Sequence, residues 1–173
     1  MAELTAQDRL QPSLLDRLTD DEPEQTQESR EKRVLSMNRL RDCVLRDLTW
    51  VFNTPHSFDP DDAERYPFAA RSVVNFGIPP LAGLTIRILD LNMLENLLRQ
   101  SILDFEPRIL QSTLRVRANL TAAQQMNHNA LMFEIEGELW GQPLPQQLYL
   151  KTEIDLESGQ VKIEQEARPS RGR

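Results

Sequence analysis

The sequence predicts an α+β fold in which two main helices pack against an antiparallel sheet of three to four strands. Two observations lead to this prediction. The chain before Pro107 holds two stretches in which apolar residues recur every three or four positions, the spacing of one helix face. The second half holds four short stretches in which apolar and polar residues alternate, the period of a strand with one face in water.

Residues 1–29 form a predicted flexible, acidic arm. Residues 1–31 carry nine Asp and Glu against three Lys and Arg, whereas the whole chain has a net charge of -7. Such a polar stretch cannot bury enough apolar surface to order itself. Three leucines nevertheless follow Ser13, a suitable N-cap, at helical spacing. They are Leu14, Leu15 and Leu18. This turn is either a segment that docks on a partner or a helix that packs back on its own domain.

The predicted α+β domain spans residues 30–167, and residues 168–173 form a basic tail. Its first helix runs from about Ser29 to Asn53 without Gly or Pro. The apolar stripe of this helix consists of Val34, Met37, Leu40, Val44, Leu48 and Val51. Trp50 and Phe52 adjoin the stripe, and we expect both in the core. Cys43 is expected to be a small buried thiol, since a single cysteine cannot form an internal disulfide.

The second helix is predicted from about Asp90, its N-cap, to Phe105. Its apolar face consists of Met93, Leu94, Leu97, Leu98, Ile102 and Phe105. Before it, residues 72–80 mix a short apolar run with a Gly-Ile-Pro-Pro breaker, which predicts a short helix or extended piece and then a fixed loop. After Pro107, which ends the helical pattern, the strands are predicted at about 112–119, 130–139, 147–155 and 160–165. Gly137 is a candidate bulge in the second strand.

The junction around Pro107 holds a candidate interaction pair. If its backbone is extended, Glu106 and Arg108 project to the same side. Such a pair is either solvated at the surface, where it contributes about 0–1 kcal/mol, or it binds a partner. In the second case truncating either side chain is expected to break binding while folding survives. A third alternative is an internal brace of the helix-to-strand junction.

Catalytic and cofactor chemistry is thinly represented. The only histidines are His56 and His128, and no nucleophile elbow, metal-ligand spacing or glycine-rich phosphate loop is present. We therefore expect no cofactor and no metal. Asp104 and Glu106 are the one carboxylate pair beside apolar residues, but Arg108 favours the ionised form of Glu106, the opposite of what a glycosidase acid needs.

Charge and hydropathy limit the classes of partner and the cell compartment that we expect for this protein. Outside the arm the chain is close to neutral, which excludes a basic nucleic-acid surface as the main function. No apolar run approaches the ~20 residues that span a bilayer. The first residues are acidic and polar, unlike a secretory signal, so a cytoplasmic protein that reaches membranes only through partners is expected.

Five stretches resemble, in order, one protein family. They are Ser13-Leu14-Leu15-Asp16-Arg17-Leu18, Arg46-Asp47-Leu48-Thr49-Trp50-Val51-Phe52-Asn53-Thr54, Tyr66-Pro67, Ser72-Val73-Val74-Asn75-Phe76-Gly77-Ile78-Pro79 and Phe105-Glu106-Pro107-Arg108. The family is the baseplate wedge family shared by contractile phage tails and type VI secretion systems, also called lysozyme-like. The resemblance is closest to its type VI secretion members, the TssE subunits.

This resemblance implies a non-enzymatic structural subunit of a type VI secretion baseplate, located in the cytoplasm at the inner-membrane-docked baseplate. Its partners would be other wedge subunits and the contractile sheath, which it would template or anchor. The implied partner-binding residues are Glu106, Pro107 and Arg108, together with the three leucines of the arm. A phage-tail wedge subunit is the alternative, less favoured because of the long acidic arm. A peptidoglycan-cleaving enzyme is a weaker alternative, since a cytoplasmic chain does not meet peptidoglycan.

Overall fold

The computed structural model describes residues 13–19, 24, 37–83, 90–119, 130–140 and 145–165. Its helices are α1 (Leu14–Leu18), α2 (Met37–Phe52), α3 (Pro60–Arg65), α4 (Pro67–Ala70), the 3₁₀ helix η2 (Val73–Asn75) and α5 (Leu91–Phe105). Its strands are β1 (Arg115–Ala118), β2 (Ala130–Leu139), β3 (Gln146–Asp155) and β4 (Val161–Gln165). The predicted α+β class is confirmed: the four strands form one antiparallel sheet in the order β1-β2-β3-β4.

The sheet follows the predicted strands closely. β2 has the predicted bounds, β3 and β4 each differ by one residue at the start, and β1 begins three residues late. The late start arises because the N–H of Thr113 donates to the carbonyl of Leu110 (3.0 Å) and closes a turn there. The predicted bulge is wrong: Gly137 pairs in regular register with Leu148. A Cβ at Gly137 would lie 3.1 Å from Cγ2 of Ile109, so this glycine permits a close approach of the chain.

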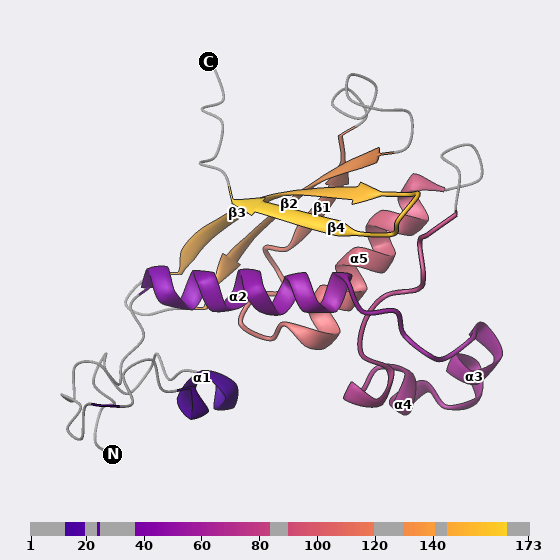
Figure 1. Ribbon diagram of the computed structural model, residues 1–173, viewed down its shortest axis with the longest axis horizontal. Helices are drawn as coiled ribbons and strands as arrows, with labels where there is room; N and C mark the ends of the chain where they lie inside the picture. The colour runs from indigo at the N-terminus through magenta and orange to yellow at the C-terminus, as the bar shows by residue number, and fades with distance from the viewer. Residues whose placement is uncertain are drawn as a thin grey trace.

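The two main helices lie on one side of the sheet (Figure 1). α2 places the described part of its predicted stripe, Leu40, Val44, Leu48 and Val51, in the core, and α5 adds a second apolar face. Fully buried side chains of this core include Val44, Leu48, Leu98, Ile102, Phe133, Ile135, Leu150 and Ile154. The opposite sheet face carries charged side chains in cross-strand pairs, such as Arg115 opposite Glu136. One wet face therefore follows from the alternation of polar and apolar residues in the strands.

The helices match the predictions except at two apolar side chains. Asp90 caps α5 by accepting from the N–H of Asn92 (2.9 Å), as expected, and Cys43 is buried. Trp50, however, is 48% exposed rather than in the core, and the guanidinium of Arg46 lies 5.0 Å from its ring centroid. Met93 is also exposed. Both residues sit at the margin of an apolar stripe, where a helix turns from its neighbours toward water.

Residues 57–76, here called the lobe, project from the two main helices. The lobe contains α3, α4 and η2, and neither α3 nor α4 contributes a buried residue. The predicted short helix in residues 72–80 is confirmed as η2 followed by a loop. At its base, Pro55 pairs with Ile78 in an isolated parallel bridge. Gly77 has a φ of 118°, and a Cβ there would clash with the carbonyl of Thr54, so only glycine fits this base.

Several predictions fall outside the described residues. These are the first turns of the helix predicted from Ser29, the surroundings of His128, and the basic tail at 168–173. The domain boundary near residue 30 and the flexibility of the arm therefore stay predictions.

Candidate functional site

The junction around Pro107 is a turn, so the prediction of an extended backbone is wrong. The N–H of Ile109 donates to the carbonyl of Glu106 (3.2 Å), which closes a turn over Pro107 and Arg108. Proline favours the first central position of such a turn because its φ is already fixed. The N–H of Trp140 then donates to the carbonyl of Arg108 (2.7 Å), which fastens this turn to the end of β2.

Within the turn, Glu106 and Arg108 form a bidentate ion pair. Nε of Arg108 lies 2.6 Å from Oε1 of Glu106, and Nη2 lies 2.5 Å from Oε2. The backbone N–H of Arg108 also donates to Oε1 (3.2 Å). The two side chains thus meet, as predicted, but Glu106 is only 2% exposed. Because the charge of Glu106 is withdrawn from water, we expect the fold to depend on this pair, as it would for an internal brace of the junction.

A residue of α2 completes the coordination of Arg108. Oδ2 of Asp47 lies 2.5 Å from Nη2 of Arg108. Burial by itself would lower the pKa of the Arg108 guanidinium, but hydrogen bonds and charge from Glu106 and Asp47 outweigh burial and raise it. Nη1 of Arg108 is buried and has no hydrogen-bond partner among the described residues. Arg108 is thus held in one orientation with one donor group unused.

The ion pairs continue from Asp47 to the arm. Nε of Arg46 donates to Oδ1 of Asp47 (2.9 Å), and Nη1 donates to Oδ1 of Asp16 (2.7 Å). Asp16, Arg46, Asp47, Arg108 and Glu106 therefore form one chain of alternating charge, here called the ion-pair chain. It joins three segments that are distant in sequence: α1, α2 and the turn after α5.

Asp16 is the residue that attaches α1. Its side chain is only 4% exposed, and its Oδ2 accepts from the hydroxyl of Ser13 (2.6 Å). Burial would raise the pKa of Asp16, but hydrogen bonds from Ser13, Arg46 and Cys43 lower it to about 2. Ser13 is the N-cap, as predicted, since its Oγ accepts from the N–H of Asp16 (3.3 Å). α1 thus packs back on the domain through a carboxylate.

The leucines of α1 are exposed, on the side of the helix away from the contact of Asp16 with the domain. Leu14 is 71% exposed, Leu15 44% and Leu18 74%. Figure 1 shows α1 beside α2 as a separate short turn of helix. The two alternatives for this segment are therefore compatible: α1 is attached to its own domain, and its apolar side chains face away from it.

Sequence reasoning missed three members of the ion-pair chain. Asp16, Arg46 and Asp47 lie inside the stretches that resemble the family, but no role was predicted for them. Arg46 and Asp47 had been placed off the apolar stripe of their helix, and Asp16 sits between exposed leucines. The available signal was a pair of adjacent charges beside the apolar stripe of a helix, but such a pair does not identify its partners.

The carboxylates of the candidate glycosidase pair are both engaged by guanidinium groups. Oδ1 of Asp104 lies 2.6 Å from Nη2 of Arg71, and Glu106 is held by Arg108. Across the described ranges, no group of three His, Cys, Asp or Glu side chains could hold a metal ion. Nor does any described helix have the length and apolar character to cross a membrane.

Comparison with known proteins gives one match. Residues 38–144 match the family described as baseplate wedge protein gp25. The match covers more than half of the chain, from α2 to the end of β2, and so includes Arg46, Asp47, Glu106 and Arg108. No curated protein and no solved structure matches the chain.

Proposed function

The chain belongs to the baseplate wedge protein gp25 family, and from this membership we propose that it is a non-enzymatic structural subunit of a type VI secretion baseplate, resembling the TssE subunits. In this role it joins the other wedge subunits and templates or anchors the contractile sheath. The family supports a structural role in a baseplate. The secretion system, the named partners and the lack of catalysis are the proposed parts.

The observation that carries the proposal is the way α1 is presented. Asp16 attaches α1 through Arg46, while Leu14, Leu15 and Leu18 face away from the domain. Burying an exposed leucine against a partner contributes about 1.5–3 kcal/mol. Three such side chains on one short helix form an apolar patch of the kind that marks protein contacts. An attached helix also loses less conformational freedom on binding than a free arm.

The turn at Pro107 is the second proposed contact. Pro107 is exposed, and the side chain of Arg108 beside it is 22% exposed. In this proposal the exposed part of the guanidinium binds a carboxylate of a wedge subunit, an acceptor that suits its fork of donors. In this arrangement Glu106 does not touch the partner. It holds the fork of Arg108 in the orientation that the partner meets.

The open edge of β4 is the proposed sheath contact. Both backbone groups of Val161 are taken by the side chain of Asn53, at 2.9 Å each. Because alternate residues of an edge strand point outward, Ile163 and Gln165 present the next outward backbone groups. A sheath strand could pair with these groups by extending the sheet. The charge of the domain favours protein partners over nucleic acid, and we place the protein in the cytoplasm at an inner-membrane-docked baseplate.

A phage-tail wedge subunit is the alternative within the same family, and the neighbouring genes distinguish the two. Sheath and baseplate genes of a secretion cluster would support our proposal, whereas a phage tail operon would support the alternative. A peptidoglycan-cleaving enzyme is disfavoured, because a general acid must give up a proton and both candidate carboxylates are paired with arginine.

The direct experiment is co-purification of the chain with its wedge subunits. The variant Leu14→Ser/Leu15→Ser/Leu18→Ser is expected to keep the wild-type melting temperature, since these side chains are exposed, and to lose co-purification. Met93→Ser, which changes an equally exposed apolar side chain on α5, is the matched control and should co-purify normally. Normal recovery of wedge subunits with the triple variant would refute the proposed contact.

A further inference from the structure

We propose that the lobe carries a further docking surface, separate from α1, the Pro107 turn and the edge of β4. Its occupant is a segment of a partner protein that presents apolar side chains flanked by Lys or Arg. This inference does not depend on the proposed function, because it is carried by a different set of residues.

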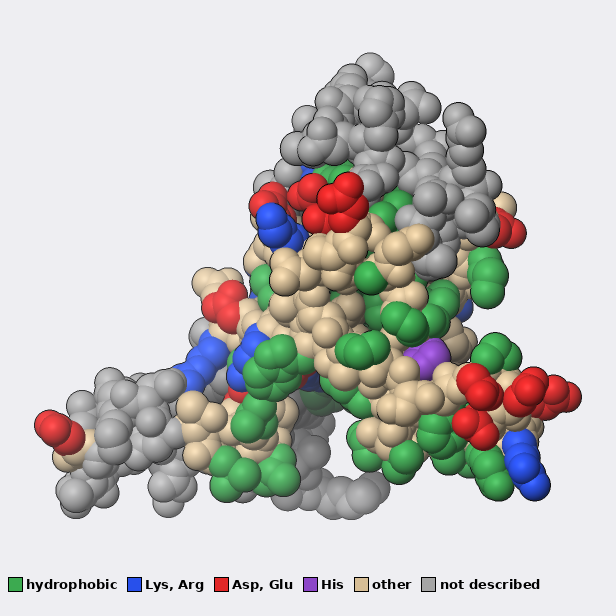
Figure 2. Space-filling model, turned by 45° about the vertical axis from the view of Figure 1, so that its right-hand side comes forward, with side chains coloured by type: hydrophobic (Ala, Val, Ile, Leu, Met, Phe, Trp, Pro, Cys, Tyr) green, Lys and Arg blue, Asp and Glu red, His purple; other side chains and the backbone are tan. Residues whose placement is uncertain are grey.

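Four large apolar side chains of the lobe are exposed. Tyr66 is 51% exposed, Phe68 93%, Val73 81% and Val74 68%. They come from the junction of α3 with α4, from α4 itself and from η2, elements that contact one another. Figure 2 shows hydrophobic side chains gathered on this projecting part of the molecule. A phenylalanine that is almost fully in water contributes nothing to the core, and an exposed apolar cluster of this kind is typical of a surface that contacts a partner.

Acidic side chains border this apolar surface. Asp59, Asp61, Asp62 and Glu64 are all exposed in and before α3. Figure 2 shows acidic side chains beside the hydrophobic ones of the lobe. The two arginines of the lobe are both occupied: Arg71 pairs with Asp104, and Arg65 lies over the ring of Tyr66 at 5.6 Å. The lobe carries four carboxylates against these two arginines, so its border is negative and charge complementarity selects a basic partner.

The lobe is held in place by Phe76, whose ring lies 5.1 Å from that of Phe105 at the core, and by polar contacts. Asn75 is buried, and its Oδ1 accepts from the N–H groups of Ser57 (3.1 Å) and Phe58 (2.9 Å). Its Nδ2 donates to the carbonyl of Ala70 (3.1 Å), so one side chain ties both ends of the lobe together. The exposed apolar groups thus stand on a fixed backbone. A preorganised surface loses little conformational entropy when it binds.

The same charges disfavour other occupants. The acidic arm of this chain, with nine Asp and Glu in residues 1–31, would be repelled by the border. A second copy would place one acidic border against another unless it turned a basic surface to it. An anionic membrane would be repelled for the same reason.

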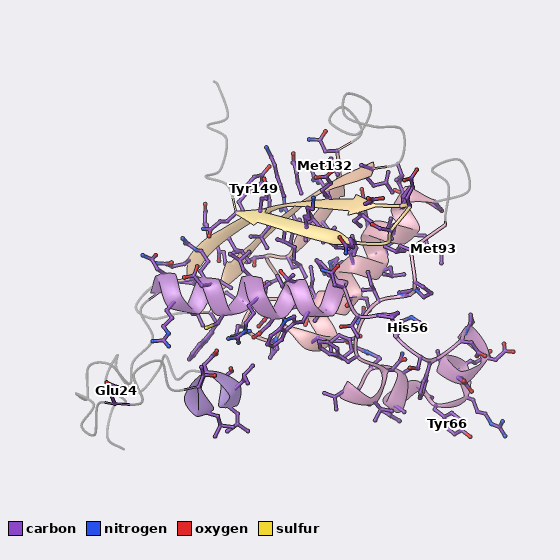
Figure 3. The ribbon with its side chains drawn as sticks, viewed as in Figure 1. Glu24, His56, Tyr66, Met93, Met132 and Tyr149 are labelled. Carbon is purple, nitrogen blue, oxygen red and sulfur yellow. The ribbon has the colours of Figure 1, made fainter. Side chains whose placement is uncertain are left out.

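The test uses two synthetic helical peptides of equal length, one of Leu and Lys and one of Leu and Glu. Binding to the full chain is measured by fluorescence anisotropy. We expect the Lys peptide to bind at least about tenfold more tightly than the Glu peptide. Phe68→Ser/Val73→Ser should weaken its binding by at least about tenfold. Met93→Ser should leave binding unchanged; Figure 3 shows Met93 on α5, apart from Tyr66 in the lobe.

Charge is tested by a second variant in the same assay. Asp61→Asn/Asp62→Asn should remove most of the preference for the Lys peptide while the apolar side chains stay in place. Equal binding of the two peptides to wild-type protein would overturn the proposal. So would a Lys-peptide affinity that is insensitive to Phe68→Ser/Val73→Ser, because the peptide would then bind the acidic arm or another surface. Sedimentation that shows self-association abolished by Phe68→Ser would overturn it in favour of a second copy.

Discussion

Replacing Arg108 with alanine is expected to destabilise the folded chain. The substitution removes the two guanidinium contacts to Glu106, at 2.6 and 2.5 Å, and the contact to Asp47. The carboxylate of Glu106 stays 2% exposed in the wild-type fold, so its charge would be stranded away from water with only a backbone N–H for a partner. Removing one member of a buried pair costs about 3–5 kcal/mol.

The side chain of Arg108 is itself 22% exposed, which places the expected loss at the low end of this range. About 3 kcal/mol corresponds to a fall of about 10 °C in Tm for a domain of this size. The assay is thermal and urea unfolding followed by circular dichroism. Arg71→Ala is the matched control, because Arg71 is 65% exposed and Nε2 of Gln100 would still donate to Oδ1 of Asp104 (2.9 Å) after the substitution. It should melt close to the wild type.

A double variant separates stranded charge from lost packing. Glu106→Gln/Arg108→Ala removes the buried charge along with its partner, so it should melt above Arg108→Ala alone. If Arg108→Ala has the same melting temperature as Arg71→Ala, the pair of Glu106 and Arg108 is not an internal brace. The reasoning from the burial of Glu106 would then be wrong. A double variant that is less stable than Arg108→Ala would also contradict it.

Three further predictions concern other parts of the chain. Asp16→Asn should lower the free energy of unfolding by about 1–2 kcal/mol at neutral pH. Because the pKa of Asp16 is lowered from 3.8 to about 2, this difference from wild type should persist above pH 4 and vanish as the pH falls through 2 in paired unfolding curves. Gln165→Pro removes an outward N–H of β4 and should block sheath recruitment in an assembly assay. Glu164→Pro instead breaks a hydrogen bond to β3 and should destabilise the sheet. Unchanged sheath assembly with a folded Gln165→Pro chain would exclude the edge contact. Purified protein should leave peptidoglycan intact in a turbidity assay, and clearing that Glu106→Gln abolishes would establish an enzyme instead.

Periodicity alone predicted α2, α5 and the four strands, but not α3 and α4. The bounds of β2 and the cap and end of α5 agree with the pattern of apolar residues, because side-chain spacing within one element is a local property. The contact of Glu106 with Arg108 was predictable for the same reason, since only Pro107 lies between them. The family was also visible in the sequence, because its motifs are contiguous.

The tertiary structure decided which neighbours those elements meet. Arg108 contacts Asp47 across 61 positions of sequence, and Arg46 contacts Asp16 across 30. A helical stripe shows which side chains share a face, but it does not show what covers the margins of that face. Trp50 therefore came out exposed and Glu106 buried, the reverse of what residue type favours. The sequence by itself determined the ion pair of Glu106 with Arg108, because both residues belong to one turn. Only the tertiary structure joined this pair to Asp47, Arg46 and Asp16, because these charges come from separate segments that packing brings together.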